Sequence, residues 1–457
     1  MKRVYEEVIS LDRKCYDTYA MSEDLLMEHA ATGLLDALPE NTCSILIVSG
    51  PGNNGADGIA LARMSEGSYE KVALYLPYGA RSPMAQLQLQ RAEKVGVTIV
   101  EDLVEADVVV DALFGSGLSR PLDERAQSIV TDMNDLQGYK IACDIPSGID
   151  DRGNVENVAF IADKTVTMGA LKIALFNDMA KDYVGEIVKA DLGVSAARYE
   201  EESDIYLLER EDLILPLRHA KNCHKGNFGH LNVVAGKKAG AGIIAAEAAY
   251  AFGTGLVTVV ENEPYTVPCE LMSSTTLTHN VTAICIGMGL GNQFDDAYLG
   301  KFLIEHDLPV LIDADLFYHP ILKKTLSRKS NLVLTPHPKE FASLLSITGV
   351  AEANVHEIQA DRFGYAKRFS DRYPDLVLVL KGANTLIAHQ GKLYIQPFGS
   401  NILSKGGSGD VLGGLIAALL AQGYSVLDAA ISGSIAHALS ARNFTKNNYA
   451  LRPLDLI

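Results

Sequence analysis

Polar side chains that suit cation binding and proton transfer recur where apolar runs of the sequence end. They are Asn53, Asn54 and Asp57 in "GPGNNGADG", Asp111, Gly115 and Ser116 in "DALFGSGLSRP", and Asp144 and Ser147 in "DIPSGID". Hard oxygen ligands of these types suit a group I or group II cation, and the lack of His and Cys among them argues against zinc. Carboxylates in the same place could also transfer protons if burial raised their pKa.

A single aspartate at a strand end is often only a helix cap or a turn residue. Three polar clusters at equivalent positions make that explanation less attractive. The first loop is glycine-rich but does not follow the dinucleotide fingerprint G-x-G-x-x-G, because asparagines and an aspartate interrupt its glycines. We interpret it as one side of a polar pocket, and which aspartate moves a proton stays open.

A second set of residues that could bind a ligand or catalyse a reaction lies in "SKGGSGDVLGG", residues 404–414. Glycines there would leave the first amides of a following helix free, and such a helix start attracts anions by about 1 kcal/mol through its dipole. Asp410 lies where a catalytic base could meet a phosphate. The plainer alternative is a glycine-rich loop with an aspartate cap. We expect Gly413 and Gly414 to serve close packing.

Four shorter motifs accompany this loop, and each is weak alone. "KGANT" offers a cation, glycine backbone and a hydroxyl, and "IGMGLG" ends an apolar run with glycines. "LIDADLF" contains Asp313 and Asp315, and "TPHPKEF" contains His337 and Glu340. A His and a Glu this close, without further ligands, more often serve structure or substrate positioning than metal binding.

The elements that must position these residues alternate between short β-rich runs and amphipathic stretches. This alternation predicts an α/β fold with a doubly wound parallel sheet, whose ligand lies beyond the carboxyl ends of the strands. The polar segment "SAARYEEESD" interrupts the pattern and is interpreted as a linker. We therefore predict two domains, residues 1–204 and 205–457, with no evident internal repeat.

Composition narrows the function classes. A chain of 457 residues with 48% hydrophobic residues can form two or three sizeable domains. The net charge of −17 opposes nucleic-acid binding. Six scattered cysteines without a C-x-x-C pair favour a reducing cytoplasm. Acidic residues near the N-terminus argue against a signal peptide, and the longest apolar stretch, 243–260, contains Glu247, so no membrane segment is expected.

The motifs of the first half, together with "LMEHAATGL", resemble the epimerase domain of the bifunctional NAD(P)H-hydrate repair enzymes, a Rossmann-like domain. That domain interconverts the R and S epimers of NADHX and NADPHX, which are nicotinamide cofactors hydrated at ring carbon 6. The resemblance implies K⁺ ligands, namely Asn54, Asp111 and Ser147. It also implies contacts to the hydrate from Asn53, Asn54, Gly55, Ala56, Asp57, Gly115, Ser116, Gly117, Leu118, Ser119, Arg120, Pro121 and Asp144.

We predict that Asp144 is the acid/base of this domain. Lys172 in "GALKIAL" is a further polar candidate, for which a solvated position is expected.

The second half resembles the ribokinase-like dehydratase domain of the same family, which removes water from the S hydrate at the expense of ADP or ATP. The resemblance implies catalysis by Asp410, bound Mg²⁺, and hydrate contacts from Gly289, Gly291, His337, Pro338, Lys339, Glu340, Phe341, Ala342, Ser343 and Asp410. It implies ADP contacts from Lys381, Gly382, Ala383, Asn384, Thr385, Ser400, Asn401, Ile402, Leu403, Ser404, Lys405, Gly406, Gly407, Ser408 and Gly409.

Two stretches depart from the family pattern. "ILSK" stands where bacterial members commonly have a proline or glycine, then methionine, alanine and threonine, and "GKKAGAG" has lysines in place of a small polar residue. Lys237, Lys238 and Lys405 could contact phosphate or lie in solvent. These residues leave the choice between ADP and ATP open, and ADP is the prediction.

Two other functions stay open at this point. Ribokinase-like domains also occur in small-molecule kinases, and the fold does not decide function. The N-terminal half could instead be a non-catalytic dinucleotide sensor, although Asp111 and Asp144 are both present. We expect small-molecule partners only, no nucleic acid or membrane, and a homo-oligomer.

Overall fold

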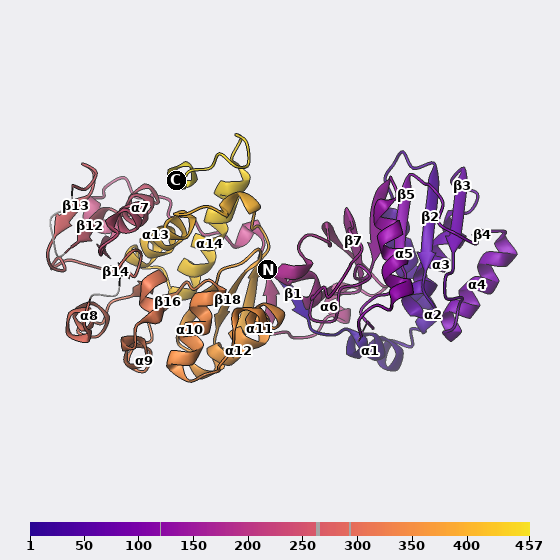
Figure 1. Cartoon of the computed structure of the whole chain (residues 1–457), viewed down its shortest axis with the longest axis horizontal. Helices are drawn as coiled ribbons and strands as arrows, with labels where there is room; N and C mark the ends of the chain where they lie inside the picture. The colour runs from indigo at the N-terminus through magenta and orange to yellow at the C-terminus, as the bar shows by residue number, and fades with distance from the viewer. Residues whose placement is uncertain (119, 262–265, 292–293) are drawn as a thin grey trace. The chain divides into compact units, whose positions relative to one another are not determined.

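The computed structural model describes residues 1–118, 120–261, 266–291 and 294–457. The chain divides into two compact units, which are described separately (Figure 1). The N-terminal unit comprises Arg3–Ser203, and the C-terminal unit comprises Asp204–Ile457 together with Met1–Lys2. Both units combine parallel sheets with helices, so the α/β prediction is confirmed.

The N-terminal unit is a parallel sheet flanked by helices. Its strands are β1 (Lys2–Tyr5), β2 (Ser44–Ser49), β3 (Lys71–Tyr75), β4 (Thr98–Val100), β5 (Val108–Ala112), β6 (Tyr139–Cys143), β7 (Lys164–Met168), β8 (Leu171–Lys172) and β9 (Glu186–Ala190). Its α-helices are α1 (Ile9–Tyr19), α2 (Glu23–Asp36), α3 (Asn53–Ser65), α4 (Pro83–Val95), α5 (Glu124–Asp135) and α6 (Ala196–Tyr199). Two 3₁₀ turns, Ile173–Phe176 and Asp178–Ala180, follow β8.

The strand order of the main sheet is β4-β3-β2-β5-β6-β7-β9, and each neighbouring pair is parallel. Alternate residues of β2 point to opposite faces, because side chains alternate along a strand. Ile45 and Ile47 pack with α2 and α3, while Leu46 and Val48 pack with α5. The sheet is therefore covered on both sides, as in a doubly wound fold.

The segment predicted as a linker is only partly one. Its first half forms α6, and Tyr199 on α6 is buried in the same hydrophobic cluster as α1 and α2. Because acidic residues surround Tyr199 in the sequence, the sequence gives no sign that this side chain is buried. The division between the two units falls after Ser203, within the predicted segment.

The C-terminal unit has a second sheet. Its strands are β10 (Ile205–Leu207), β11 (His230–Val234), β12 (Leu256–Val260), β13 (Met272–Ser274), β14 (Ala283–Ile286), β15 (Val310–Ile312), β16 (Leu332–Leu334), β17 (Val377–Leu380), β18 (Thr385–His389) and β19 (Lys392–Gln396). Its helices are α7 (Ala239–Ala251), α8 (Asp296–Leu303), α9 (Ile321–Leu326), α10 (Pro338–Thr348), α11 (Val355–Ala360), α12 (Arg362–Arg372), α13 (Ser408–Ala421) and α14 (Val426–Arg442). The 3₁₀ turns are Arg210–Asp212, Lys225–Phe228, Ala314–Tyr318, Asn401–Leu403 and Pro453–Leu456.

This sheet runs in the order β13-β12-β11-β14-β15-β16-β17-β18-β19-β10. Its strands are parallel from β13 to β17, and β18 is antiparallel to both of its neighbours. Helices α7, α13 and α14 share one hydrophobic cluster with one face of the sheet. Within the described residues, no helix is long and apolar enough to cross a membrane.

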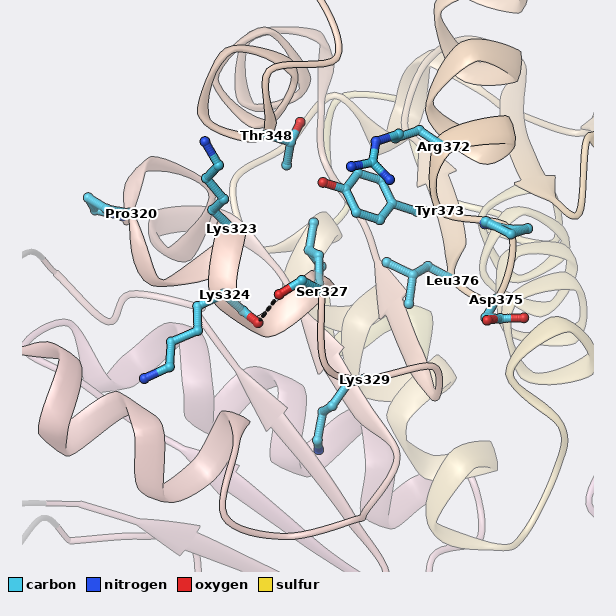
Figure 2. Close-up of a pocket in the computed structure, with 12 residues that line it drawn as sticks. Pro320, Lys323, Lys324, Ser327, Lys329, Thr348, Arg372, Tyr373, Asp375 and Leu376 are labelled. Carbon is cyan, nitrogen blue, oxygen red and sulfur yellow. Dashed lines mark hydrogen bonds between the residues drawn. The ribbon is translucent and has the colours of Figure 1, made fainter.

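A cavity of about 620 Å³ lies beside α9 and the start of β17, and none of the predicted site residues lines it (Figure 2). Lys329 precedes β16 and Leu376 precedes β17, so this cavity lies at the amino ends of the strands. Lys323 and Lys324 point away from each other in Figure 2. Ligands of doubly wound sheets bind at the opposite edge, and the predicted residues lie there.

Candidate functional site

A cavity of about 450 Å³ opens at the carboxyl ends of β2, β5 and β6 in the N-terminal unit. These three strands are neighbours in the sheet, so the loops that follow them meet at one edge. The predicted residues that line the cavity are Asn53, Asn54, Asp57, Gly115, Ser116, Gly117, Leu118, Arg120 and Asp144. The structure thus brings all three polar motifs into one pocket.

Four predicted contact residues do not line this cavity or are not described. Gly55 and Ala56 are buried, and a Cβ on Gly55 would stand 1.9 Å from the Gly50 carbonyl oxygen. Close packing of the loop on itself therefore requires Gly55, and ligand contact does not. Pro121 is exposed and lies outside the lining. Ser119 lies outside the described residues.

The start of α3 is open to a ligand. Its N-cap is Gly52, no side chain caps the first amides, and a Cβ on Gly52 would meet nothing within 4 Å. By contrast, α2 and α4 are capped by Ser22 and Ser82, whose hydroxyls accept from backbone amides. Free amides at a helix start attract anionic groups, so this end of α3 can receive a phosphate.

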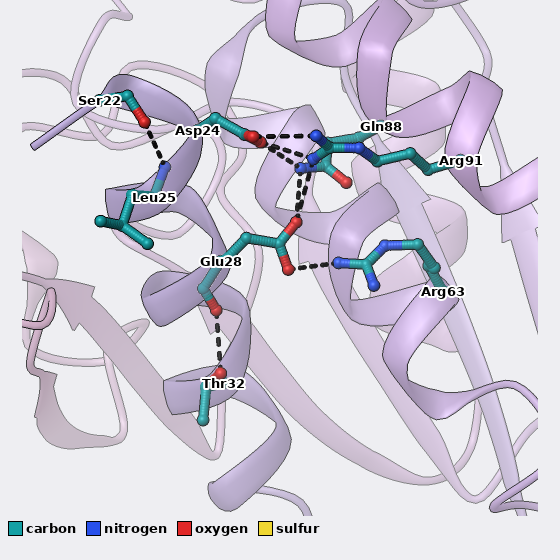
Figure 3. Close-up of polar contacts among 8 residues, drawn as sticks. All are labelled: Ser22, Asp24, Leu25, Glu28, Thr32, Arg63, Gln88 and Arg91. Atoms are coloured by element: carbon teal, nitrogen blue, oxygen red, sulfur yellow. Dashed lines mark hydrogen bonds and ion pairs between the residues drawn. The ribbon is translucent and has the colours of Figure 1, made fainter.

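A polar network fixes α2 against α3 and α4 (Figure 3). Arg91 on α4 donates to both carboxylate oxygens of Asp24, at 2.5 and 2.9 Å, and to Glu28 at 3.2 Å. Arg63 on α3 donates to the second oxygen of Glu28 at 2.5 Å. Bidentate arginine pairs are geometrically specific. The network holds the helix that carries the open amides in a fixed place beside α2.

Asp144 is the most highly coordinated carboxylate of the cavity. Its Oδ1 accepts from Lys172 Nζ at 2.5 Å, from the Met168 amide at 3.2 Å and from the Thr167 hydroxyl at 3.3 Å, and its Oδ2 accepts from the Ser116 amide at 3.3 Å. The residue is 7% exposed and has φ of 69°. A non-glycine residue in this left-handed region stores strain and is enriched at functional sites.

The expectation of a solvated Lys172 is wrong, because Lys172 is 3% exposed. Besides Asp144, its Nζ donates to the Thr167 hydroxyl at 3.1 Å and to the Met168 carbonyl at 3.0 Å. A lysine inside the apolar run "GALKIALF" was the available signal, since buried lysines need such partners.

Sequence reasoning missed one further carboxylate of the cavity, Asp12 on α1. The buried Tyr199 hydroxyl donates to Asp12 Oδ1 at 2.7 Å. Asp12 is one of several polar residues on an amphipathic helix, and its neighbours in the sequence give no sign that it faces a cavity.

The pKa values of two carboxyls in this cavity, Asp144 and Asp57, are shifted in opposite directions. Burial works to raise the pKa of Asp144, but the Lys172 ammonium and the hydrogen bonds hold it below its usual value. Burial raises the pKa of Asp57 well above its usual value, and the Asp144 and Asp12 carboxylates add to the rise. The cavity is therefore lined by two carboxyls whose pKa values are shifted in opposite directions, which is the arrangement that acid and base catalysis needs.

Of the three predicted cation ligands, Asp111 and Ser147 are hydrogen-bonded to each other, and Asn54 lines the cavity. Asp111 is fully buried, and its carboxylate accepts from the Ser147 hydroxyl and amide, each at 2.7 Å. Burial raises the pKa of Asp111 to about 6 although these bonds oppose the rise, and no cationic side chain pairs with it among the described residues. The Asn54 amide nitrogen is buried without a partner in the described chain. A buried carboxylate without a counter-charge fits a monovalent cation.

In the C-terminal unit, the predicted residues follow β14, β15, β16 and β17, which are neighbours in the sheet. Lys381 Nζ donates to Asp313 Oδ1 at 2.8 Å and lies 3.7 Å from Glu340 Oε2. The Gly291 amide donates to Asp315 Oδ2 at 2.8 Å. Gly289 and Gly291 have φ of 60° and 79°, which only glycine adopts readily. Among the described residues, no group of three His, Cys, Asp or Glu side chains could hold a metal.

The motif "TPHPKEF" forms the start of α10. His337 is its N-cap and accepts from the Lys339 and Glu340 amides, while Glu340 accepts from the His337 amide at 2.8 Å. These two residues thus have a structural role as a capping box. Of the predicted contacts on this helix, Phe341 is 0% exposed and packs on Phe369, and the Ser343 hydroxyl donates to the Phe317 carbonyl. The side chains of Phe341 and Ser343 are engaged in the protein interior.

The start of α13 resembles that of α3 in leaving its amides uncapped. Its N-cap is Gly407, with φ of 91°, and no side chain caps the first turn. A Cβ on Gly406 would meet nothing within 4 Å, and one on Gly409 would stand 3.6 Å from Lys381 Nζ. The helix start is therefore open, and the lysine lies directly beside it.

Asp410 lies in the first turn of α13. Burial raises its pKa to about 7, and the Asp313 carboxylate adds to the rise while the Lys381 ammonium opposes it. A carboxyl with a pKa near the working pH is well matched to general base catalysis.

The rest of the predicted nucleotide loop is mixed in exposure. Asn401, Ser404, Lys405 and Gly406 are exposed, as are Gly382 and Ala383, while Ile402 and Asn384 are buried. Lys237 and Lys238 are exposed as well.

The Ser408 hydroxyl lies 3.2 Å from His437 Nε2 in the interior, and burial lowers the pKa of His437 to about 4. A Cβ on Gly414 would stand 2.3 Å from the Ala245 carbonyl oxygen, so the packing role expected for this glycine is confirmed.

Comparison with known proteins gives one family match within each of the two units. A family model described as NAD(P)H-hydrate dehydratase matches residues 231–457, and one described as YjeF-related protein N-terminus matches residues 23–174. The bifunctional NAD(P)H-hydrate repair enzyme Nnr of Helicobacter pylori is 44% identical, covering 100% of this chain and 99% of its own. The corresponding Coxiella burnetii protein is 36% identical and covers 91% and 88%.

A solved structure, the ADP/ATP-dependent NAD(P)H-hydrate dehydratase of Bacillus subtilis co-crystallised with ATP and Mg²⁺, is 28% identical. It covers 52% of this chain and 90% of its own, with a TM-score of 0.45.

Proposed function

The chain belongs to the family of bifunctional NAD(P)H-hydrate repair enzymes, and we propose how its two units divide the repair. The enzyme epimerises (R)- and (S)-NAD(P)HX and dehydrates the S form to NAD(P)H. The N-terminal unit performs the epimerisation and the C-terminal unit the dehydration. The observation that carries this division is that each unit gathers carboxylates, a lysine paired with one of them and an uncapped helix start at the carboxyl edge of its own sheet.

In the N-terminal unit, the open start of α3 at Gly52 would bind the pyrophosphate of the hydrate, and the damaged ring would enter the cavity beside Asp144. Asp144 acts as a base because Lys172 keeps its carboxylate ionised at neutral pH. The proposed hydrate contacts are the predicted residues that line the cavity, namely Asn53, Asn54, Asp57, Gly115, Ser116, Gly117, Leu118, Arg120 and Asp144.

K⁺ is the cation proposed for the cluster of Asn54, Asp111 and Ser147. The carboxylate of Asp111 would supply the charge, and the side-chain oxygens of Asn54 and Ser147 would supply neutral ligands of the kind that a group I cation accepts. Bound there, the ion would supply a positive charge beneath the loops. Ser147 also ties two of these loops together, because its hydroxyl accepts from the Phe114 amide at 2.9 Å.

In the C-terminal unit, the nucleotide is ADP, which is converted to AMP and phosphate. Lys381 and the amides of Gly406, Gly407 and Gly409 would hold the terminal phosphoryl group. Hydroxide is a poor leaving group, whereas a phosphorylated oxygen leaves ring carbon 6 easily with the push of the ring nitrogen. Asp410 takes the proton of the hydroxyl group, so that its oxygen can attack the phosphoryl group, and loss of phosphate restores NADH or NADPH.

Mg²⁺ would accompany the nucleotide rather than occupy a cage of protein ligands. It commonly keeps several waters and binds one or two carboxylates together with substrate phosphates. Asp313 and Glu340 provide carboxylates close to Lys381, in agreement with such a shared site. Bound there, the ion would supply charge neutralisation to the phosphates.

One assay tests both reactions. The protein is incubated with mixed NADHX epimers, ADP and Mg²⁺, and the absorbance of NADH is followed. Complete conversion of both epimers is expected. A small-molecule kinase would regenerate no NADH, and a dehydratase fused to a non-catalytic sensor would promptly consume the S epimer alone. Replacing ADP by ATP in the same assay measures the nucleotide preference.

The partners in this proposal are small molecules, NADHX, NADPHX and ADP, in the cytoplasm. We also propose a homo-oligomer, because edge packing of α/β domains often gives symmetric assemblies. Light scattering coupled to size exclusion measures this directly, and a mass of one chain, 49.2 kDa, would contradict it.

A further inference from the structure

We infer that Asp57 is the second proton-transfer residue of the epimerase cavity, the donor that works opposite the Asp144 carboxylate. The inference rests on the proposed function of the N-terminal unit and names the group that this function still lacks. An epimerisation that opens and closes a ring removes a proton from the hydroxyl oxygen and places one on the ring nitrogen, and two groups on different elements can serve these two atoms at the same time.

Position is the first argument. Asp57 lies on α3 and Asp144 directly follows β6, and both line the same cavity. Asp57 also lines an adjoining cavity of about 110 Å³ together with Asp12 and Glu23. The two carboxyls therefore reach the same bound ring from two different elements.

Hydrogen bonding is the second argument. Asp144 accepts four hydrogen bonds, one of them from an ammonium group. Asp57 has no hydrogen-bond partner within the part of the chain that the structure describes. A partly buried carboxyl without partners is costly unless it is neutral or meets a ligand. The contrast suits a proton donor that engages the substrate.

Charge is the third argument. The groups that act on Asp57 are the Asp144 carboxylate after β6, Asp12 on α1, Glu23 on α2 and, as the one cation, Lys172 on β8. Lys172 is already engaged with Asp144. Three carboxylates thus face Asp57 against one occupied ammonium, and its pKa rises while that of Asp144 falls. Groups whose pKa values are pushed apart divide the acid and base roles.

The chemistry balances with these two residues alone. Asp144 takes the proton of the hydroxyl on ring carbon 6, and the electrons of that O–H bond form a carbonyl. The bond between carbon 6 and the ring nitrogen breaks, its electrons stay on nitrogen, and Asp57 gives its proton to that nitrogen. Rotation about the bond between carbons 5 and 6 presents the other face of the carbonyl. Closure in reverse returns both protons and gives the opposite epimer.

The test compares Asp57→Asn with the parent protein by following the interconversion of purified NADHX epimers without ADP. We expect kcat to fall by about 10²- to 10⁴-fold, the usual contribution of a general acid, with little change in KM. Dehydration of pure (S)-NADHX by the same variant should be unchanged, which shows that the C-terminal unit is intact, and an unchanged urea unfolding curve should show that the N-terminal unit is folded. Asp132→Asn, the same substitution on the exposed part of α5, is the matched control and should epimerise at the parent rate.

Asp57→Glu keeps a carboxyl and should recover part of the rate, and the pH profile provides a second measurement. Loss of a required proton makes the parent rate fall at alkaline pH, and this fall should be absent from the residual activity of Asp57→Asn. The inference is overturned if Asp57→Asn raises only KM, or if its alkaline limb equals that of the parent. If the parent itself does not interconvert the epimers, the proposed epimerase function fails instead.

Discussion

Lys172 Nζ lies 2.5 Å from Asp144 Oδ1, and both side chains are almost completely buried at the edge of the N-terminal sheet. Each charge is stabilised mainly by the other, because burial alone disfavours an ionised group. The pair therefore has two consequences: it keeps Asp144 charged, and it stabilises the N-terminal unit.

Lys172→Met should lower the free energy of unfolding of the N-terminal unit by about 3–5 kcal/mol, since it leaves a buried carboxylate without its partner. Epimerisation should be lost as well, because Asp144 would then bind a proton. Urea denaturation of the full chain measures the first effect. Lys71→Met, at an exposed position at the start of β3, should change neither.

The double variant Lys172→Met/Asp144→Asn separates the two consequences. It removes both charges, so stability should return close to that of the parent while epimerisation stays absent. A double variant as unstable as Lys172→Met would show that the lysine stabilises the unit by packing and not through its charge.

Asp410→Asn should lower kcat/KM of dehydration by about 10²- to 10⁴-fold. In the parent, kcat/KM should rise with pH through about 7, because Asp410 has a pKa raised to about 7 and must be ionised to accept a proton. NADH absorbance gives the rates, and calorimetry should show that ADP binding is largely retained. Asp371→Asn, on the exposed part of α12, is the matched control. Undiminished phosphate release by Asp410→Asn would contradict the assignment.

K⁺ should stabilise the N-terminal unit more at pH 7.5 than at pH 5. The pKa of Asp111 is raised to about 6, so without a cation the folded unit loses stability as pH rises through that value. A cation offsets this loss only where the carboxylate is ionised. At a K⁺ concentration 100 times Kd, the gain is about 2.7 kcal/mol. Thermal unfolding in KCl against choline chloride measures it, and Asp111→Asn should abolish the difference between the salts.

Gly414→Ala should destabilise the C-terminal unit by about 1–3 kcal/mol, because the new methyl group would push α7 away from α13. Gly300→Ala is the contrasting variant, since a Cβ there meets nothing within 4 Å and lies on α8. It should stabilise the helix by about 0.8–1 kcal/mol. Equal effects of the two substitutions would show that the contact between α7 and α13 does not require glycine.

The fold class and the family were predictable because they depend on local patterns. The run "SILIVSG" forms an apolar strand and "GGSGDVLGG" forms an uncapped helix start, and both can be recognised from neighbouring residues alone. The similarity to the family extends over the whole chain. Asp57, Ser116 and Asp144 line one cavity because the segments that carry them follow β2, β5 and β6, which are parallel neighbours in the sheet. This arrangement was therefore predictable from topology.

The parts of the site that sequence reasoning missed depend on distant contacts. Asp12 enters the cavity through α1, and its partner Tyr199 is 187 residues away in the chain. The Lys172 side chain is buried by elements that its own neighbours in the sequence do not reveal. The packing role of Gly55 was also missed, because the sequence cannot distinguish a glycine that makes room for a ligand from one that makes room for the protein's own backbone.

The two lysines are placed differently relative to the catalytic carboxylates. Lys172 contacts Asp144 itself, whereas Lys381 contacts Asp313 and leaves Asp410 with a pKa near neutrality. Acidification of the cell would therefore slow the removal of water while isomer exchange continued. Under such conditions, both hydrate isomers would accumulate at their equilibrium ratio, and the slow step of repair would be dehydration rather than the supply of the S isomer.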